Sequence, residues 1–511
     1  MPAPPRAATS TDADDEALPA PSLEHAPRDR AGWALPAAAG ALVAVLAAWG
    51  LSRKPFWIDE GITAGATNEL WATWKGTGGT MALYYGLLTP WSWASMHRGW
   101  LRVPSVLFAV AAVVLLWHVG RRAFDRRIAT VAALVAASSW LVVRYAQEAR
   151  SYSLVAMLTA LSWLALVRAV QADDEAERRH WWWAFAIATV LAPLAHGLAV
   201  LQFGAQVAWL AAGPDGRTWL RRIRPVFIAV AAVLSVLVIG GANDVASWIP
   251  PLNGHQVVDV LAAFTAPSPI PGLVIGLAVL AGVATCVQRR RRATDELQRW
   301  MALVPLAWGL LPLAALLVLS ILRPYFLARY AMASAPGVAL LVAFGILGPG
   351  PGLHRARTAL VGTAVAASLL AGQVALHRER GDDWTGAAKL VAEHSQVGDE
   401  VVFVSPSVRS SFDFAWDELP ASERPVVPGA FSPVEPIGQL RRFYLVHDPM
   451  LLAHDAAEEG APRYWVIDED GEALRPEAQQ FIGTPEFDAH YDVVETHHLS
   501  GGVRVMLVER R

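Results

Sequence analysis

The sequence predicts a polytopic α-helical membrane protein with a small α/β domain at its C-terminal end. Hydrophobic residues make up 54% of the 511 residues and charged residues only 17%, whereas a soluble domain carries about 25% charged residues. The apolar residues are grouped in runs that approach the length of a bilayer span. Beyond residue 376 the composition changes, because charged residues become frequent and short strand-like segments appear.

The segment before the first apolar run, residues 1–31, is rich in proline, alanine and aspartate. It lacks the compact basic region with which a signal peptide begins, so we expect a disordered cytoplasmic tail followed by an uncleaved first helix. The net charge of −3 gives no indication of nucleic acid as a partner. The single cysteine, Cys286, excludes an intrachain disulfide and a CxxC redox or zinc-ribbon site.

Eleven apolar runs are expected to cross the membrane and to form a transmembrane domain over residues 32–376. The longest apolar stretch, residues 181–212, is interpreted as two short limbs that turn at His196-Gly197, because basic residues flank both of its ends. The expected spans are 33–51, 103–120, 128–143, 152–170, 181–196, 197–212, 225–242, 271–287, 300–321, 327–347 and 358–376.

Arginine clusters follow the second, fourth, sixth, eighth and tenth spans. Since cytoplasmic loops carry an excess of basic residues, this pattern predicts a multi-pass protein of the cytoplasmic membrane with a cytoplasmic N-terminus. An odd number of spans then places residues 377–511 outside, as an extracytoplasmic α/β domain. That domain is expected to contain a helix at Trp384–His394. Its expected strands are Val401–Val404, Phe443–Val446, Tyr464–Ile467, and a hairpin of Tyr491–Leu499 with Val503–Glu509.

The loop of residues 52–102 carries two adjacent carboxylates, Asp59 and Glu60, just past the outer end of the first span. They indicate either an ordinary solvated loop or a general base or metal ligand at the membrane surface. Tyr85 belongs to a segment that is expected to lie along the membrane interface. Arg102 stands at the outer end of the second span, where it acts either as an interfacial anchor or in a site.

A second outer loop joins the third and fourth spans and contains Glu148, Arg150 and Tyr152. An arginine at the edge of a membrane is costly unless it has a partner, so Arg150 is a candidate for function. A guanidinium beside a helix N-terminus suits a phosphate group. The alternative is a structural ion pair with Asp59 or Glu60. Arg329 is a similar candidate, because it begins an otherwise apolar helix on the outer side.

Together these segments resemble the C-type glycosyltransferase superfamily (GT-C), and within it bacterial relatives of the dolichyl-phosphate-mannose protein mannosyltransferases. One departure is Met81-Ala82, where many relatives have Pro-Pro before Leu-Tyr-Tyr; it leaves the acceptor class open. The matching segments are Trp57-Ile58-Asp59-Glu60, Leu83-Tyr84-Tyr85, Leu101-Arg102-Val103-Pro104-Ser105, Tyr145 to Tyr152, His196, Ala328-Arg329-Tyr330 and Asp383-Trp384-Thr385-Gly386-Ala387-Ala388.

The resemblance implies a GT-C bundle that transfers a sugar, mannose by default, from a polyprenyl phosphate to an acceptor hydroxyl at the outer face, with inversion. It makes Asp59 the general base, with Glu60 beside it in the catalytic centre. The leaving lipid phosphate needs cations, for which Arg150, Arg329 and Arg102 are the candidates. The acceptor is a protein, a lipid or a glycan, and membrane lipids surround the enzyme.

Further side chains are expected to support the site or contact substrate. They are Glu148, Tyr85, Tyr152, His196 and Tyr330. A divalent metal ion is left open, with Asp59, Glu60, Glu148 and His196 as its candidate ligands. His196 is equally interpreted as a packing residue or polar cap, and Tyr330 as an interfacial side chain.

Three other functions remain in view. A transporter or flippase of a lipid-linked glycan should carry charged or broken segments in mid-membrane, whereas the ionisable residues here lie mainly at span ends. A non-catalytic scaffold and a glycan polymerase that uses diphosphate-linked donors are the others. The outer loop of residues 243–270 is interpreted as a mobile lid or as a plain connector.

Overall fold

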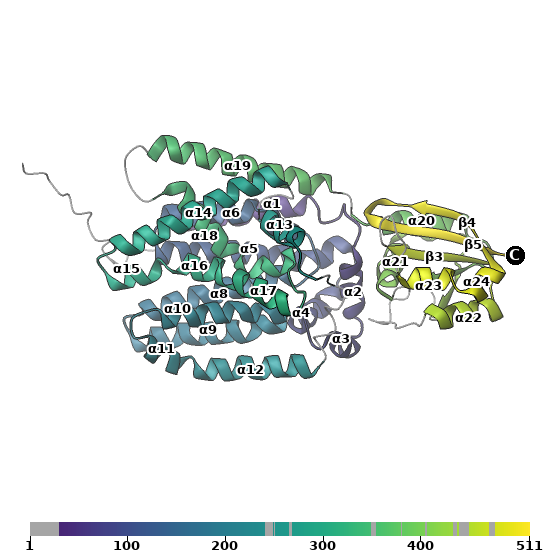
Figure 1. Cartoon of the computed structure of the whole chain (residues 1–511), viewed down its shortest axis with the longest axis horizontal. Helices are drawn as coiled ribbons and strands as arrows, with labels where there is room; N and C mark the ends of the chain where they lie inside the picture. Colours follow the sequence, from purple (N-terminus) through teal and green to yellow (C-terminus); the bar gives the residue numbers. More distant parts are fainter. Residues whose placement is uncertain are drawn as a thin grey trace, which may run out of the picture.

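The computed structural model describes residues 30–240, 249, 251–264, 268–348, 354–379, 381–403, 406–432, 437–438, 449–469 and 476–511. It shows an elongated bundle of helices with a small sheet-containing domain at one end (Figure 1). Nearly all of the expected tail of residues 1–31 lies outside the described residues, and so do the expected strand Phe443–Val446 and parts of the loop 243–270.

Each expected span coincides with a helix or with consecutive helices of the bundle. The first five correspond to α1 (Ala34–Ala48), α5 (Arg98–Ala123), α6 (Arg126–Ser138) with α7 (Trp140–Ala146), α8 (Tyr152–Gln171) and α9 (Glu175–Ala195). The others correspond to α10 (Val200–Ala211), α11 (Gly216–Arg222) with α12 (Arg224–Ile239), α14 (Pro269–Arg292), α15 (Glu296–Met301) to α16 (Val304–Gly309) and α17 (Leu311–Leu322), η4 (Ala328–Ser334) with α18 (Ala335–Leu347), and α19 (His354–Arg378).

The protein is a multi-pass membrane protein by the length and composition of its helices. In the described part of the chain six helices are long and apolar enough to cross a membrane, or up to eight if two bent pairs each count as one. The bent pairs are α6 with α7, at 57°, and α11 with α12, at 49°. Helices α1 and α10 are shorter apolar segments. Eleven crossings and their orientation therefore stay predictions.

The chain turns where the sequence predicted a hairpin. Helix α9 ends at Ala195, and His196 is in an extended conformation. The 3₁₀ turn η2 (Gly197–Ala199) then leads into α10. The described part of the loop before α14 contains one helix, α13 (Gly254–Ala263), which begins with a capping box between Asn253 and Gln256.

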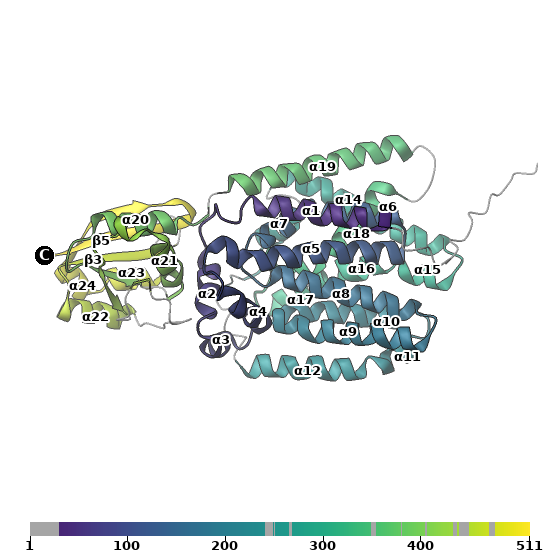
Figure 2. The ribbon, with the colours of Figure 1, turned by 180° about the vertical axis from the view of Figure 1, so that it is seen from behind.

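The early outer loop folds into three short helices at the end of the bundle that faces the sheet domain (Figure 2). They are α2 (Ile58–Ala66), α3 (Leu70–Thr77) and α4 (Ala82–Ser92). Asp59 and Glu60 lie in the first turn of α2, where negative charge is favoured by the helix dipole. Met81, which precedes α4, has φ +65°. Proline is fixed near φ −65°, so this backbone excludes the Pro-Pro pair of related sequences.

Within its described residues, the C-terminal domain forms a five-stranded mixed sheet in the order β2-β1-β3-β5-β4. Strand β1 is parallel to both β2 and β3, whereas β5 is antiparallel to β3 and β4. The strands are β1 (Glu400–Phe403), β2 (Gly429–Ser432), β3 (Arg463–Glu469), β4 (Tyr491–His498) and β5 (Val503–Arg510). The helices are α20 (Trp384–His394), α21 (Pro406–Glu418), α22 (Pro449–Glu459), α23 (Pro476–Ile482) and α24 (Pro485–His490).

The predicted fold class is confirmed, and several of its elements lie where the sequence placed them. Helix α20 has the expected bounds, and β4 and β5 form the expected hairpin. The described residues of the C-terminal domain form two separate hydrophobic cores, one around Trp384 and Trp416 and the other around Tyr464 and Phe487. Helix α21 was not predicted, and it is the element that joins this domain to α2.

Candidate active site

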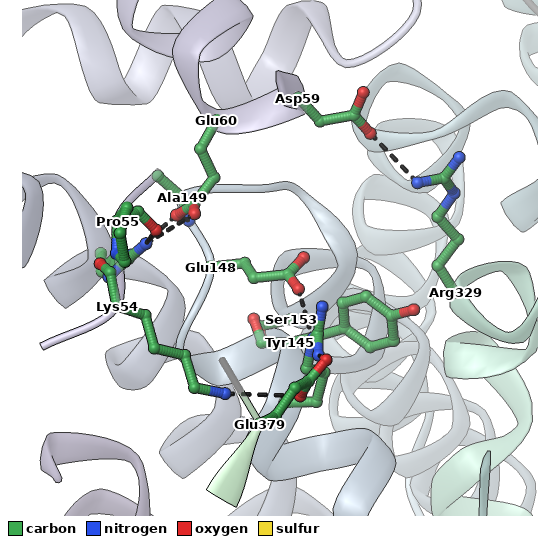
Figure 3. Close-up of polar contacts among 12 residues, drawn as sticks. Lys54, Pro55, Asp59, Glu60, Tyr145, Glu148, Ala149, Ser153, Arg329 and Glu379 are labelled. Atoms are coloured by element: carbon green, nitrogen blue, oxygen red, sulfur yellow. Dashed lines mark hydrogen bonds and ion pairs between the residues drawn. The ribbon is translucent and has the colours of Figure 1, made fainter. Parts of the chain in front are cut away.

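The carboxylate of Asp59 lies between two guanidinium groups at the end of the bundle. Nη1 of Arg329 donates to Oδ2 of Asp59 over 3.1 Å, as Figure 3 shows. Nη2 of Arg150 lies 3.3 Å from the same oxygen. The Asp59 side chain is still 21% exposed, and its Oδ1 accepts no hydrogen bond from the described residues. Oδ2 of Asp59 therefore faces both guanidinium groups, while Oδ1 keeps free hydrogen-bonding capacity toward the described residues.

Arg150 is a buried and well-anchored cation. Its Nη1 donates to the carbonyl oxygen of Asp59 and to Oγ1 of Thr63, each over 3.1 Å, and reaches the hydroxyl of Tyr85 over 3.5 Å. Burial by itself would lower the pKa of Arg150, but Asp59 and Tyr85 outweigh it and raise the pKa well above its usual value. The guanidinium therefore stays charged in a buried position.

Aromatic side chains line the same region. The guanidinium carbon of Arg329 lies 5.5 Å from the ring centre of Trp57 and 5.7 Å from that of Tyr330, which are cation–π distances. The rings of Tyr152 and His196 lie 5.7 Å apart, and those of His196 and Tyr330 lie 4.8 Å apart. The expected supporting residues Tyr152, His196 and Tyr330 therefore form one wall beside the cations.

Tyr85 approaches the site from α4. Its hydroxyl lies beside Arg150 and donates to the sulfur of Met81 over 3.7 Å. Burial raises the pKa of Tyr85, so the hydroxyl remains a neutral donor. The left-handed backbone of Met81 thus positions both the start of α4 and a partner of this tyrosine.

Glu60 and Arg102 form a separate, fully buried pair. Nε and Nη2 of Arg102 donate to the two oxygens of Glu60 over 2.8 and 2.7 Å, and the N–H of Ala149 donates to Glu60 Oε1 over 2.7 Å. The remaining donors of Arg102 bind the carbonyl oxygens of Leu51, Lys54 and Pro55. The sequence expected Glu60 in catalysis and Arg102 on the donor phosphate, but here each neutralises the other and joins three segments.

Glu148 belongs to a third group that lies apart from Asp59 (Figure 3). Nε of Arg144 donates to Oε1 of Glu148 over 2.7 Å, and Arg144 also pairs with Glu379. Nζ of Lys54 lies 3.4 Å from the other oxygen of Glu379. Burial raises the pKa of Glu148. Burial alone would raise the pKa of Glu379 as well. The positive charges of Arg144 and Lys54 outweigh burial there, so the pKa of Glu379 is lowered.

The four candidate metal ligands are not brought together. Asp59, Glu60 and Glu148 are each paired with arginine, and Nδ1 of His196 accepts from the N–H of Leu198 over 3.3 Å. Within the described ranges no three His, Cys, Asp or Glu side chains are close enough to hold a metal ion. These residues do not fit a metal site, and no step of the mechanism below uses one.

A cavity of about 460 Å³ lies where the bundle meets the C-terminal domain. The bundle contributes Arg53 and Glu379 to its lining, and the C-terminal domain contributes Asp383 and Ser500. None of the residues around Asp59 lines it. The cavity is therefore distinct from the Asp59 site.

Some contributors to the site were missed by the sequence analysis. Thr63 lies four residues after Asp59 on α2; its Oγ1 donates to the Asp59 carbonyl oxygen over 2.8 Å and accepts from Arg150. The helical spacing of four residues was a signal that could have found it. Arg144, Lys54 and Glu379 were also missed, since their pairing depends on how α19 packs against the outer loops.

Comparisons with known proteins give one sequence family and several solved structures. Residues 95–240 match the family model of the dolichyl-phosphate-mannose-protein mannosyltransferases. The apo structure of ArnT from Cupriavidus metallidurans superposes with a TM-score of 0.59 at 13% identity, covering 93% of this chain and 98% of that chain. ArnT bound to undecaprenyl phosphate gives 0.59 at 12% identity, over 94% and 98%. The chain has the GT-C fold.

A second relative of this fold is larger than the chain. The oligosaccharyltransferase of Archaeoglobus fulgidus, tethered to an acceptor peptide with an NVT sequon, gives a TM-score of 0.57 at 12% identity. The match covers 94% of this chain and 74% of that chain. No curated protein matches the sequence itself. The predicted GT-C resemblance, including its likeness to the protein mannosyltransferases, is confirmed.

Proposed function

We propose that the protein is a membrane glycosyltransferase that moves a sugar from a polyprenyl phosphate to an acceptor hydroxyl at the outer face of the cytoplasmic membrane. The observation that carries the proposal is the Asp59 carboxylate between Arg150 and Arg329, in a GT-C fold. The fold is shared with a structure that binds undecaprenyl phosphate. A lipid donor keeps its tail in the bilayer, so its reacting carbon belongs at the end of the bundle.

The cations explain how a lipid phosphate would be held and released. Arg150 and Arg329 now share one carboxylate oxygen. A donor phosphate offers more negative charge than that oxygen and is a better partner for two guanidinium groups. As the bond between the anomeric carbon and the phosphate oxygen breaks, its electron pair moves to the phosphate, and the two fixed cations stabilise the growing charge.

Asp59 is the proposed general base. The acceptor oxygen attacks the anomeric carbon on the face opposite the phosphate, and its proton passes to Oδ1 of Asp59, the oxygen that accepts no hydrogen bond from the described residues. The attack from that face inverts the anomeric carbon. Glu60 and Arg102 serve as positioning residues in this proposal, because their charges are already paired. Tyr85, Tyr152, His196 and Tyr330 shape the pocket for the sugar.

The sugar and the acceptor follow from the comparisons only as proposals. Mannose is the first sugar to test, since residues 95–240 match a mannosyltransferase family model. A protein hydroxyl is the first acceptor to test, and lipid or glycan hydroxyls come next. No nucleotide is needed in this proposal, because the donor carries its own phosphate leaving group.

A flippase of a lipid-linked glycan is the second candidate. Its translocation path should place ionisable side chains deep between the spans. Arg150 and Arg329 instead meet Asp59 on α2, and α2 lies at the end of the bundle that faces the sheet domain (Figure 2). This position favours chemistry at the interface over transport through the bundle. A non-catalytic scaffold is disfavoured because buried cations around one carboxylate are costly without a task.

The test is single-turnover transfer from radiolabelled polyprenyl-phosphate-mannose in membranes. Wild type should release free lipid phosphate and label an acceptor, whereas Asp59→Asn should lose about 10²- to 10⁴-fold in rate. Asp455→Asn is the matched control, because Asp455 is an exposed acid on α22 in the C-terminal domain. Full activity in Asp59→Asn removes Asp59 as the base. Silence of wild type across a panel of lipid-phosphate sugars overturns the transferase in favour of transport.

A further inference from the structure

Helix α21 of the C-terminal domain packs directly on α2, the helix that carries Asp59. Their approach depends on Gly61, two residues after Asp59. A Cβ atom at Gly61 would lie 2.7 Å from the backbone nitrogen of Ser411 and 2.8 Å from its Cα. Contacts of that kind with backbone atoms cannot be relieved by a side-chain rotation. The two helices are therefore in backbone contact beside the proposed base.

Phe414 of α21 is inserted into the bundle. Its ring centre lies 4.4 Å from that of Phe56, which precedes α2. Phe414 belongs to the hydrophobic core of the bundle, whereas its neighbours Phe412 and Trp416 belong to the core of the C-terminal domain. Two turns of one helix thus contribute to two cores. Phe414 connects the C-terminal domain to the bundle and is not part of the core of its own domain.

A half-buried ion pair supports the same junction. Nη1 of Arg98, at the start of α5, lies 3.5 Å from Oε2 of Glu418, the last residue of α21. Such a pair contributes little energy by itself, but it fixes the end of α21 against the bundle. The apolar contact, the glycine contact and the ion pair all hold the same face of α21.

The contact of Phe414 leads to the first turn of α2 in two steps. The guanidinium carbon of Arg102 lies 5.0 Å from the ring centre of Phe56. Arg102 binds both oxygens of Glu60, which is the neighbour of Asp59 in the chain. The position of Phe56 therefore affects the Arg102–Glu60 pair. That pair in turn fixes the rotation of the first turn of α2.

We propose that α21 is a brace that positions the Asp59 carboxylate, with Phe414 as its principal positioning residue. The C-terminal domain then acts in catalysis by holding α2, whether or not it also binds the acceptor. The proposal rests on the proposed function, since it takes Asp59 to be the base. A small displacement of a catalytic group costs on the order of 10²-fold in rate, so loosening the brace should lower kcat.

The test compares two identical deletions in the full-length protein. Phe414→Ala removes the ring that contacts the bundle. Phe431→Ala removes a ring that packs against Tyr464 inside the C-terminal domain, with ring centres 5.1 Å apart. Phe414→Ala should lower kcat about 10- to 100-fold and leave the KM for the lipid donor within about twofold. Phe431→Ala should lower the melting temperature while kcat stays unchanged.

A second measurement does not depend on activity. Hydrogen exchange of the α2 amides should become faster in Phe414→Ala and stay as in wild type in Phe431→Ala. Phe414→Leu should restore most of both kcat and protection, because it refills the apolar contact with Phe56. The double variant Phe56→Ala, Phe414→Ala should be no slower than the slower single variant, since both changes break one contact.

Three results would overturn the brace. One is unchanged kcat and unchanged α2 exchange in Phe414→Ala. Another is an equal loss of kcat in Phe414→Ala and Phe431→Ala, which would indicate general destabilisation. The third is a change in donor KM alone. Failure of the proposed function is distinguished from these outcomes, because it appears as full activity in Asp59→Asn while the exchange experiment still reports on α2.

Discussion

Asp59 and Glu60 are neighbours in the chain, yet the structure gives them opposite environments. Glu60 is 1% exposed and meets Arg102 with both carboxylate oxygens. Asp59 is 21% exposed and meets two arginines with one oxygen. Consecutive residues of a helix point about 100° apart, so one turn of α2 directs one acid into the bundle and the other toward the site. A completely paired acid has no oxygen left for a substrate, whereas an incompletely paired one is available for chemistry.

The largest expected effect breaks the closed pair. Arg102→Leu leaves the Glu60 carboxylate buried without its partner, and loss of one member of such a pair costs about 3–5 kcal/mol of stability. Thermal unfolding in detergent should show this loss. Arg98→Leu is the matched control from the same helix, because its pair with Glu418 is partly exposed and contributes less than about 1 kcal/mol. Equal losses of stability in the two variants would contradict the prediction that the buried pair matters more than the partly exposed one.

The next effect concerns the open cluster. Arg329→Ala should lower turnover about 10²- to 10³-fold, because a fixed cation is removed from the leaving phosphate. The melting temperature should change little compared with Arg102→Leu. Arg323→Ala is the control, since Arg323 is an exposed arginine at the end of α17 just before η4. A similar loss of rate in both variants would mean that general positive charge, and not position, matters.

The smallest effect is a pH dependence of the two acids around Arg144. The pKa of Glu379 is lowered in the folded protein, so its contribution to stability is present above the unfolded pKa and disappears as the pH falls through the folded pKa. Glu379→Gln should therefore destabilise the protein at pH 7 and have no effect once the pH lies below the folded pKa of Glu379. Urea unfolding at several pH values measures this difference.

Glu148 should behave in the opposite way. Its pKa is raised by burial, so its carboxyl destabilises the fold once the pH exceeds the unfolded pKa, and it does so most above the folded pKa. Glu148→Gln should therefore gain stability over wild type as the pH rises toward 7. The same sign of change in Glu148→Gln and Glu379→Gln would contradict the assignment of the two acids to different environments.

Local patterns in the sequence were sufficient for the helices and for part of the sheet domain. Runs of apolar residues predicted all the long helices, because a bilayer demands continuous hydrophobic segments. The turn at Ser500 to Gly502 predicted the hairpin of β4 and β5. Helix α21 was missed, although Val408, Phe412, Ala415, Trp416 and Leu419 follow a helical spacing and share one core. Only Phe414 lies off that stripe and serves the core of the bundle. The break within 126–146 was missed as well, because a bend leaves the composition of a span unchanged.

The sequence by itself determined which residues stand at the ends of spans, and this was enough to find Asp59, Arg150 and Arg329. Only the tertiary structure decided how they pair. Arg329 is 270 residues from Asp59, and Arg102 is 42 residues from Glu60. Which arginine meets which acid depends on the rotation of α2 and on the packing of α21 behind it. Periodicity reports the buried face of a helix, but it carries no information about the partner across the interface.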